Sequence, residues 1–80
     1  MAPELQNYYE DRFLMMSTQG WNDLIEDLEN MKKPIEDVTA IKTVDDLYFR
    51  KGQLDIIKWI LTLKEVSALA YEELKNEDTL

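Results

Sequence analysis

The stretch LDIIKWILTL, residues 54–63, constrains the fold of this chain more than any other segment. Most of its side chains are apolar, and they do not alternate with polar ones as they do in a half-buried strand. Polar residues nevertheless return at helical intervals, among them Asp55, Lys58 and Glu65, so the pattern is not apolar all round as in a membrane span. The segment is therefore predicted to belong to an amphipathic helix.

The helix that contains this stretch is predicted to run from about residue 44 to 76. Thr43 is the predicted cap, because a threonine hydroxyl accepts a hydrogen bond from an N–H group of the first turn. At about 100° per residue, the apolar side chains form two rows. The row expected to face a neighbouring helix comprises Phe49, Ile56, Trp59, Ile60, Leu63, Ala70 and Leu74. The row turned away from it comprises Leu47, Leu54, Ile57, Leu61 and Ala68.

A second helix is predicted from about residue 4 to 32. Its apolar residues step by three and four along the chain, which is typical of a helix that presents one seam to another helix. This seam comprises Trp21, Leu24, Leu28, Met31, Ile35 and Val38. Pro34 disfavours helical geometry at Lys33, so the helix is expected to end or kink there, and residues 33–43 are expected to form a turn.

The predicted fold is all-α: a single domain, residues 1–80, built as an antiparallel hairpin of two long helices. Pairing the helices around the turn puts Gly52 near Leu28 and Met31, where a small residue permits close approach. The alternative is a three-helix bundle with a break at Ser17–Gly20, since glycine, serine and threonine all weaken a helix interior. The apolar register continues across this segment, which favours the unbroken helix.

No catalytic, metal or cofactor site is predicted. The chain has no cysteine and no histidine, which removes disulfides, thiolate chemistry, imidazole bases and nearly every zinc site. Asp23, Glu26 and Asp27 share one side of a helix, but they lie beside or opposite the seam, where acids are normally solvated. Ser17 and Ser67 have no base to activate them. We do not expect an enzyme.

The charge balance bears on partners. Seventeen acids against nine bases give a net charge of −8, which repels nucleic-acid phosphates and anionic lipid surfaces. Neither nucleic acid nor a membrane is therefore expected as a partner. The first residues, MAPELQNYYEDR, carry acids where a secretory signal carries lysines, so secretion by a signal peptide is not expected.

The second apolar row predicts a protein partner. Side chains of this size forgo about 1.5–3 kcal/mol each when left in water, a large share of the roughly 5–15 kcal/mol that stabilises a small domain. We expect a larger protein or a second copy of the chain to cover them, unless the three-helix bundle does so by itself. The predicted partner-binding residues are Leu47, Leu54, Ile57 and Leu61, with Tyr8, Tyr9 and Phe13 of the aromatic N-terminal region.

Residues 48–74, YFRKGQLDIIKWILTLKEVSALAYEEL, resemble the second helix of small acidic helical proteins of tailed bacteriophages. The similarity lies in a phenylalanine and an arginine just ahead of a glycine, a Leu-x-x-Ile-x-Trp-Ile-Leu run, and a closing Tyr-Glu-Glu-Leu. It covers about a third of the chain. The resemblance implies a structural or assembly protein, found in the virion or the host cytoplasm, and it brings no catalytic residues with it.

Two functions follow as hypotheses. The first is a non-enzymatic protein–protein interaction module, an accessory protein of phage head or tail assembly that docks through the helix at 44–76 onto a larger viral structural protein or onto itself. The second is an acidic inhibitor that mimics nucleic acid and blocks a host nucleic-acid-binding enzyme. Salt distinguishes them, because binding by exposed charges weakens as ionic strength rises and apolar docking does not.

Overall fold

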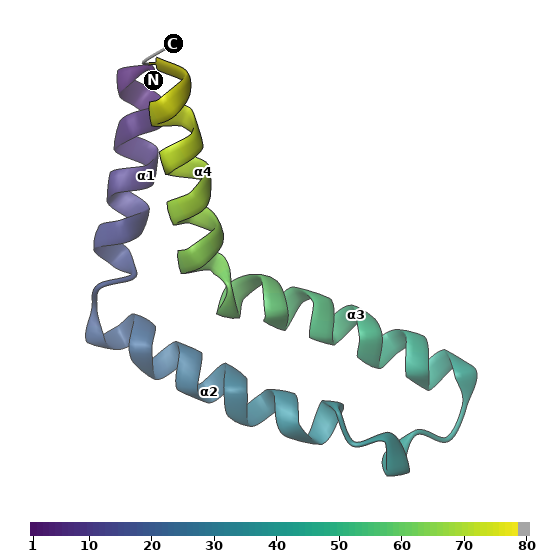
Figure 1. Cartoon of the computed structure of the whole chain (residues 1–80). Coiled ribbons are helices and arrows are strands. Elements are labelled where there is room, and N and C mark those ends of the chain that lie inside the picture. The colour runs from purple at the N-terminus through teal and green to yellow at the C-terminus, as the bar shows by residue number, and fades with distance from the viewer. Residues whose placement is uncertain (79–80) are drawn as a thin grey trace. The chain divides into compact units, whose positions relative to one another are not determined.

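The computed structural model describes residues 1–78 and contains, over that range, four α-helices and one short 3-10 turn (Figure 1). The elements in chain order are α1 (Pro3–Met15), α2 (Gln19–Ile35), η1 (Val38–Ala40), α3 (Val44–Leu61) and α4 (Leu63–Asp78). Residues 1–78 contain no strand, which confirms the all-α class. The two-helix hairpin is not confirmed, because each of the two long helices predicted from the sequence is divided into two.

The interruption between α1 and α2 falls at residues 16–18. The Ser17 and Thr18 hydroxyls donate hydrogen bonds to the carbonyls of Leu14 (2.7 Å) and Met15 (2.8 Å), which are end-of-helix acceptors. The Thr18 hydroxyl also accepts a hydrogen bond at 3.2 Å from the backbone N–H of Trp21 and so caps α2. The prediction of an unbroken helix over 4–32 is wrong here, and the alternative break at Ser17–Gly20 overlaps the observed one.

The interruption between α3 and α4 is a single residue, Thr62. The N–H of Val66 donates to the Thr62 carbonyl at 3.0 Å, so α4 starts its own hydrogen-bond ladder there. The prediction of one helix over 44–76 is therefore wrong at this point. A local signal exists, because Thr62-Leu63-Lys64-Glu65 has the Ser/Thr-x-x-Glu pattern of a helix start, although no glycine or proline accompanies it.

The chain divides into two compact units. The terminal unit combines Met1–Asn22 with the chain from Thr62 onward, and the central unit is Asp23–Leu61. In the terminal unit α1 and α4 lie side by side and antiparallel (Figure 1). The Tyr71 ring of α4 contacts the rings of Tyr9 and Phe13 of α1, with centroids 5.8 and 5.6 Å apart. Edge-on aromatic contacts of this kind fasten the two helices together.

In the central unit α2 and α3 run antiparallel and are joined by the turn that contains η1 (Figure 1). The Thr43 hydroxyl accepts a hydrogen bond at 3.0 Å from the N–H of Asp46, which confirms the predicted cap of α3. Pro34 lies in the last turn of α2, and the helix ends one residue later, at Ile35 rather than at about residue 32. The helix continues slightly further than expected, because Pro34 is accommodated within its last turn.

Few large side chains are fully buried among the described residues. Met16 and Leu63 are buried in the terminal unit, and Leu28 and Ile57 are buried in the central unit. Fifteen large hydrophobic side chains between residues 1 and 78, in contrast, are exposed to solvent. The core is thin, as expected for a chain of this length, and much apolar surface faces solvent.

Candidate protein-interaction surface

Arg50 fixes how α3 is rotated against α2. Its Nη1 donates hydrogen bonds to the carbonyls of Pro34 (3.1 Å) and Ile35 (3.3 Å), and its Nε pairs with Asp46 at 3.1 Å. The arginine thus supplies donors to the C-terminal end of α2, whose last carbonyls have no partner within their own helix. The side of α3 that carries Arg50 must therefore face α2.

With α3 rotated in this way, the apolar row that we expected to face away from α2 packs against it. Arg50, Leu54, Ile57 and Leu61 are spaced four, three and four residues apart, so they share one side of the helix. Ile57 is only 7% exposed, and Leu54 and Leu61 are half-buried. The prediction that this row faces away from the neighbouring helix is wrong for the central unit. Two rows exist as predicted, but within α3 the row that contains Leu54, Ile57 and Leu61 is the one that α2 covers.

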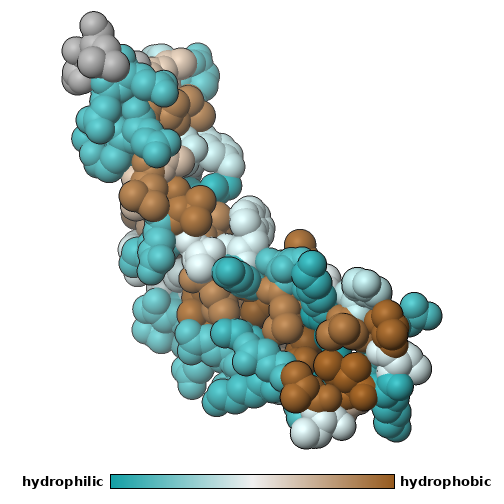
Figure 2. Space-filling model, turned by 45° about the vertical axis from the view of Figure 1, so that its right-hand side comes forward, coloured by the Kyte–Doolittle hydropathy of each residue, from teal (hydrophilic) through white to brown (hydrophobic). Residues whose placement is uncertain are grey.

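Three members of the row that was expected to pack inward are exposed in α3, whereas Leu63 is buried and Ile60, Ala70 and Leu74 are half-buried. Phe49 is 67% exposed, Ile56 62% and Trp59 54%. With Gly52 between the first two, these residues step by three, four and three along α3, the spacing of one continuous helix face. We call Phe49, Gly52, Ile56 and Trp59 the α3 outer row. Figure 2 shows hydrophobic side chains, in brown, reaching the surface between hydrophilic ones.

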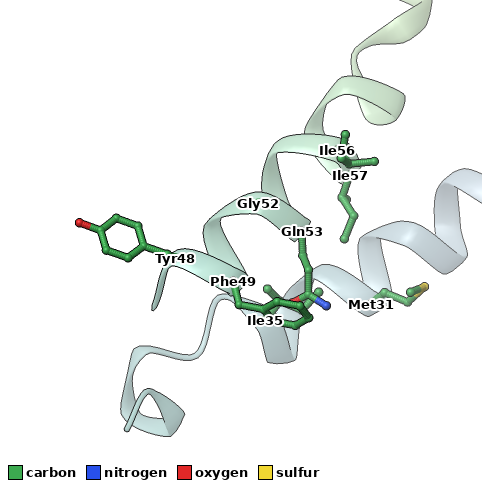
Figure 3. A pocket seen from close by; sticks show the side chains of 8 residues that line it. All are labelled: Met31, Ile35, Tyr48, Phe49, Gly52, Gln53, Ile56 and Ile57. Carbon is green, nitrogen blue, oxygen red and sulfur yellow. The ribbon is translucent and has the colours of Figure 1, made fainter. Parts of the chain in front are cut away.

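Beside this row lies a hollow between α2 and α3, which we call the α2–α3 groove (Figure 3). Its volume is about 580 Å³ and it is open to solvent. Figure 3 shows Tyr48 pointing away from α2 and Ile57 pointing toward it, so the groove lies on the flank of α3. The groove is lined by Met31 and Ile35 of α2 and by Tyr48, Phe49, Gly52, Gln53, Ile56 and Ile57 of α3. The α3 outer row and the seam of α2 thus border one apolar surface.

Gly52 is not explained by packing within the chain. A Cβ atom at this position would have no neighbouring atom within 4 Å. The prediction that Gly52 permits close approach of the first helix is therefore wrong. Its φ is not positive either, so no special backbone conformation requires glycine here.

Three aspartates border the same surface. Asp27, Asp45 and Asp55 each precede an exposed apolar side chain by four residues, namely Met31, Phe49 and Trp59. Residues four apart are neighbours on a helix surface, so each carboxylate lies one turn from an apolar side chain of the groove or the outer row.

These carboxylates are exposed, and no ion pair or hydrogen bond joins their side chains to another residue between 1 and 78. Lys51 and Lys58 lie roughly half a turn from Phe49 and Ile56 and about a quarter of a turn from Gly52 and Trp59. On the side of Phe49 and Ile56 the charge next to the apolar surface is therefore negative.

The remaining predicted partner-binding residues lie elsewhere. Leu47, which is 47% exposed, and the half-buried Leu54 line a second hollow of about 480 Å³ on the other flank of α3, together with Val38 and Ile41. This hollow is shared with Arg50, whose guanidinium is already occupied by α2. Of the predicted set, Leu47 and Leu54 thus line this second hollow, whereas Ile57, which is 7% exposed, lines the α2–α3 groove.

Tyr8, Tyr9 and Phe13 belong to the terminal unit. Tyr9 and Phe13 are half-buried against Tyr71. Tyr8 is 51% exposed, and the Arg12 guanidinium lies over its ring at 4.6 Å while also hydrogen-bonding its hydroxyl. The aromatic region therefore serves mainly to fasten α1 to α4, and Tyr8 is its most exposed ring.

Nothing in the described chain forms a second kind of site. Residues 1–78 hold no group of three or more acidic side chains placed to bind a metal ion. No helix in this range combines the length and the apolar character that crossing a bilayer requires. No family model matches the sequence, and neither a curated protein nor a solved structure matches it.

Proposed function

We propose that this chain is a non-enzymatic protein–protein interaction module that docks a helix of its partner along the α2–α3 groove and the α3 outer row. The observation that carries the proposal is the exposure, by more than half, of Phe49, Ile56 and Trp59 at helical spacing on one face of α3. A partner helix with apolar side chains at the same spacing would bury this face as helix-in-groove complexes do.

The energetics support docking. Phe49, Ile56 and Trp59 are the large apolar and aromatic side chains that dominate the binding energy of interfaces when they are fully covered. A role in head or tail assembly, as the resemblance of residues 48–74 to phage proteins implies, is part of this proposal, because such proteins act by binding neighbouring subunits.

The test is selection from a displayed library of helical peptides with apolar residues at every third and fourth position and random charge elsewhere. The wild-type chain is expected to enrich binders, and the double variant Phe49→Ser/Ile56→Ser is expected to enrich none. Lys51→Ser, on the opposite side of α3, is the matched control and should enrich the same peptides as wild type. Circular dichroism checks that all three chains remain helical. Equal enrichment by the double variant would discard this surface.

The nucleic-acid mimic is a second candidate, favoured by the exposed carboxylates of Asp27, Asp45 and Asp55. Apolar side chains separate these acids, whereas a mimic of a phosphate backbone needs an uninterrupted charged face. Salt distinguishes the candidates. A peptide bound mainly by the apolar face should stay bound at an ionic strength of about 1 M, where the Debye length is only about 3 Å, and a basic cleft held by charge alone should dissociate.

A further inference from the structure

We infer, on the basis of the proposed function, that the segment docked by this chain is a basic amphipathic helix whose backbone passes close to Gly52 and whose lysines or arginines meet Asp27, Asp45 and Asp55. Three separate features of the central unit lead to this partner: the charge at its apolar surface, the glycine within that surface, and the length of the outer row.

The first feature is the charge. Each of the three carboxylates lies one turn from an apolar side chain that a partner helix would touch, so each would lie at the rim of the interface. A partner with lysine or arginine beside its own apolar stripe meets all three rim charges with opposite charge. Complementary rim charges of this kind set orientation and speed association.

The second feature is Gly52. A glycine inside a helix destabilises it relative to alanine, and no contact within the chain requires one here. The glycine lies between Phe49 and Ile56 in the outer row, one turn from each, and leaves a shallow gap between two large side chains. A partner helix that crosses at this gap approaches α3 more closely than it could over any other residue of the row.

The third feature is the length of the row. Phe49 and Trp59 are ten residues apart, which corresponds to about 15 Å along the helix axis. A partner helix of about three turns spans this distance with anchors at positions i, i+3, i+7 and i+10. The site therefore fits one short helix, and it does not require a folded domain.

A second copy of the chain fits the same surface less well. In a two-fold symmetric pair the same patch lies on both sides of the contact, so the aspartates of one copy would gather beside those of the other. Each chain also carries a net charge of −8, which opposes association with itself. The basic helix meets neither difficulty.

The experiment uses two synthetic helical peptides of about 18 residues, or roughly 27 Å of helix. Both carry leucine and isoleucine anchors at the spacing of the outer row; one is flanked by lysine and arginine and the other, at the same positions, by glutamate. Binding to the full chain is measured by anisotropy of a dye on the peptide at about physiological salt. The basic peptide is expected to bind at least about a hundredfold more tightly than the acidic one.

Two sets of variants locate the contact. Changing Asp27, Asp45 and Asp55 together to asparagine should weaken binding of the basic peptide by about tenfold or more and reduce the preference for it over the acidic peptide. Gly52→Ala should raise the melting temperature of the free chain, since alanine favours the helix, and should nevertheless weaken binding of the basic peptide about fivefold or more. Gly20→Ala, in the first turn of α2, also meets open space and is the matched control, with binding unchanged.

The outcomes separate this inference from the proposed function. If both peptides bind equally and both require Phe49 and Ile56, the proposed interaction surface is supported and the inference that the partner helix is basic is wrong. If neither peptide binds and the library selection also fails, the proposed function fails as well. A dimer of the chain alone, dispersed by Ile56→Ser in sedimentation, would assign the surface to a second copy and overturn the basic helix. Unchanged binding by Gly52→Ala would refute the close crossing.

Discussion

α2 and α3 belong to the same unit and pair with each other, yet they place their apolar side chains differently. α2 carries one apolar seam, with Leu28 buried at its centre and Met31 at its edge. α3 carries two rows, and pairing with a single helix covers only one of them. Ile57 is 7% exposed and its neighbour Ile56 is 62% exposed, although the two side chains are chemically identical. The comparison shows that the rotation of a helix, and not the character of a residue, decides what is left for a partner.

The two isoleucines give the largest expected effect. Ile57→Ala removes buried methyl groups and should lower the free energy of unfolding by about 2–4 kcal/mol. Ile56→Ala should change it by less than about 0.5 kcal/mol, because the side chain is already largely in water. Urea unfolding followed by circular dichroism measures both. Similar losses for the two variants would mean that α3 is rotated differently from the structure.

The next largest effect is expected when the hydrogen bonds of Arg50, which fix the rotation of α3 against α2, are removed. Arg50→Met keeps much of the aliphatic stem but loses the hydrogen bonds to the carbonyls of Pro34 and Ile35, and should cost about 1–2 kcal/mol of unfolding free energy. Lys51→Met, at the adjacent exposed position, is the control and should be close to neutral. If both variants are equally stable, the arginine does not hold α3 against α2.

α2 and α3 differ in their apolar faces, but their N-terminal caps should contribute similarly to stability. Thr18→Ala removes the hydroxyl that accepts from Trp21 N–H at the start of α2, and Thr43→Ala removes the one that accepts from Asp46 N–H at the start of α3. Each should cost about 1 kcal/mol, the usual contribution of a helix cap. Replacement by serine in each case keeps an acceptor and should restore most of the loss. A neutral Thr43→Ala would show that Asp46 and Arg50 hold the turn without the cap.

The smallest effect concerns the turn between α2 and α3. Hydrogen bonds from the Thr39 hydroxyl and then from the Thr39 N–H, with a smaller contribution from Arg50, hold the pKa of Asp37 below its ordinary value of 3.8. A lowered pKa in the folded state means that the ionised carboxylate stabilises the fold above pH 3.8, and that this contribution is lost as the pH falls through the lowered value.

Asp37→Asn should therefore lower the melting temperature slightly at neutral pH. The difference from wild type should shrink below the ordinary pKa of 3.8 and disappear once the wild-type carboxyl is protonated. Thermal unfolding followed by circular dichroism at a series of pH values measures this. Thr39→Val, which removes the strongest donor to the carboxylate, should reproduce part of the effect. A difference that persists undiminished in strong acid would contradict this account of the turn.

Much of the local structure is visible in the sequence. The helical class follows from apolar spacing, and the start of α3 follows from Thr43 ahead of two aspartates. The predicted seam of the first helix is confirmed in part: Leu28 is buried, but Leu24 and Met31 are exposed, and Val38 lies in η1 beyond the end of α2. Hydroxyl side chains that compete for backbone carbonyls make Ser17–Gly20 a weak segment in the sequence, but the continuous apolar register favoured an unbroken helix there, and that prediction was wrong. The interruption at Thr62 was not predicted. Its helix-start pattern lies within a strongly apolar stretch, and the apolar spacing of that stretch favours one continuous helix.

The sequence by itself determined that residues 44–61 form a helix with more apolar surface than one neighbour covers, because this depends only on spacing along the chain. Only the tertiary structure decided which of the two rows is covered. That choice depends on Arg50 reaching the end of α2, at Pro34 and Ile35, across 15 or 16 residues of chain. Helical periodicity fixes the angle between the rows but leaves the rotation of the helix free, and a contact distant in sequence is needed to set it.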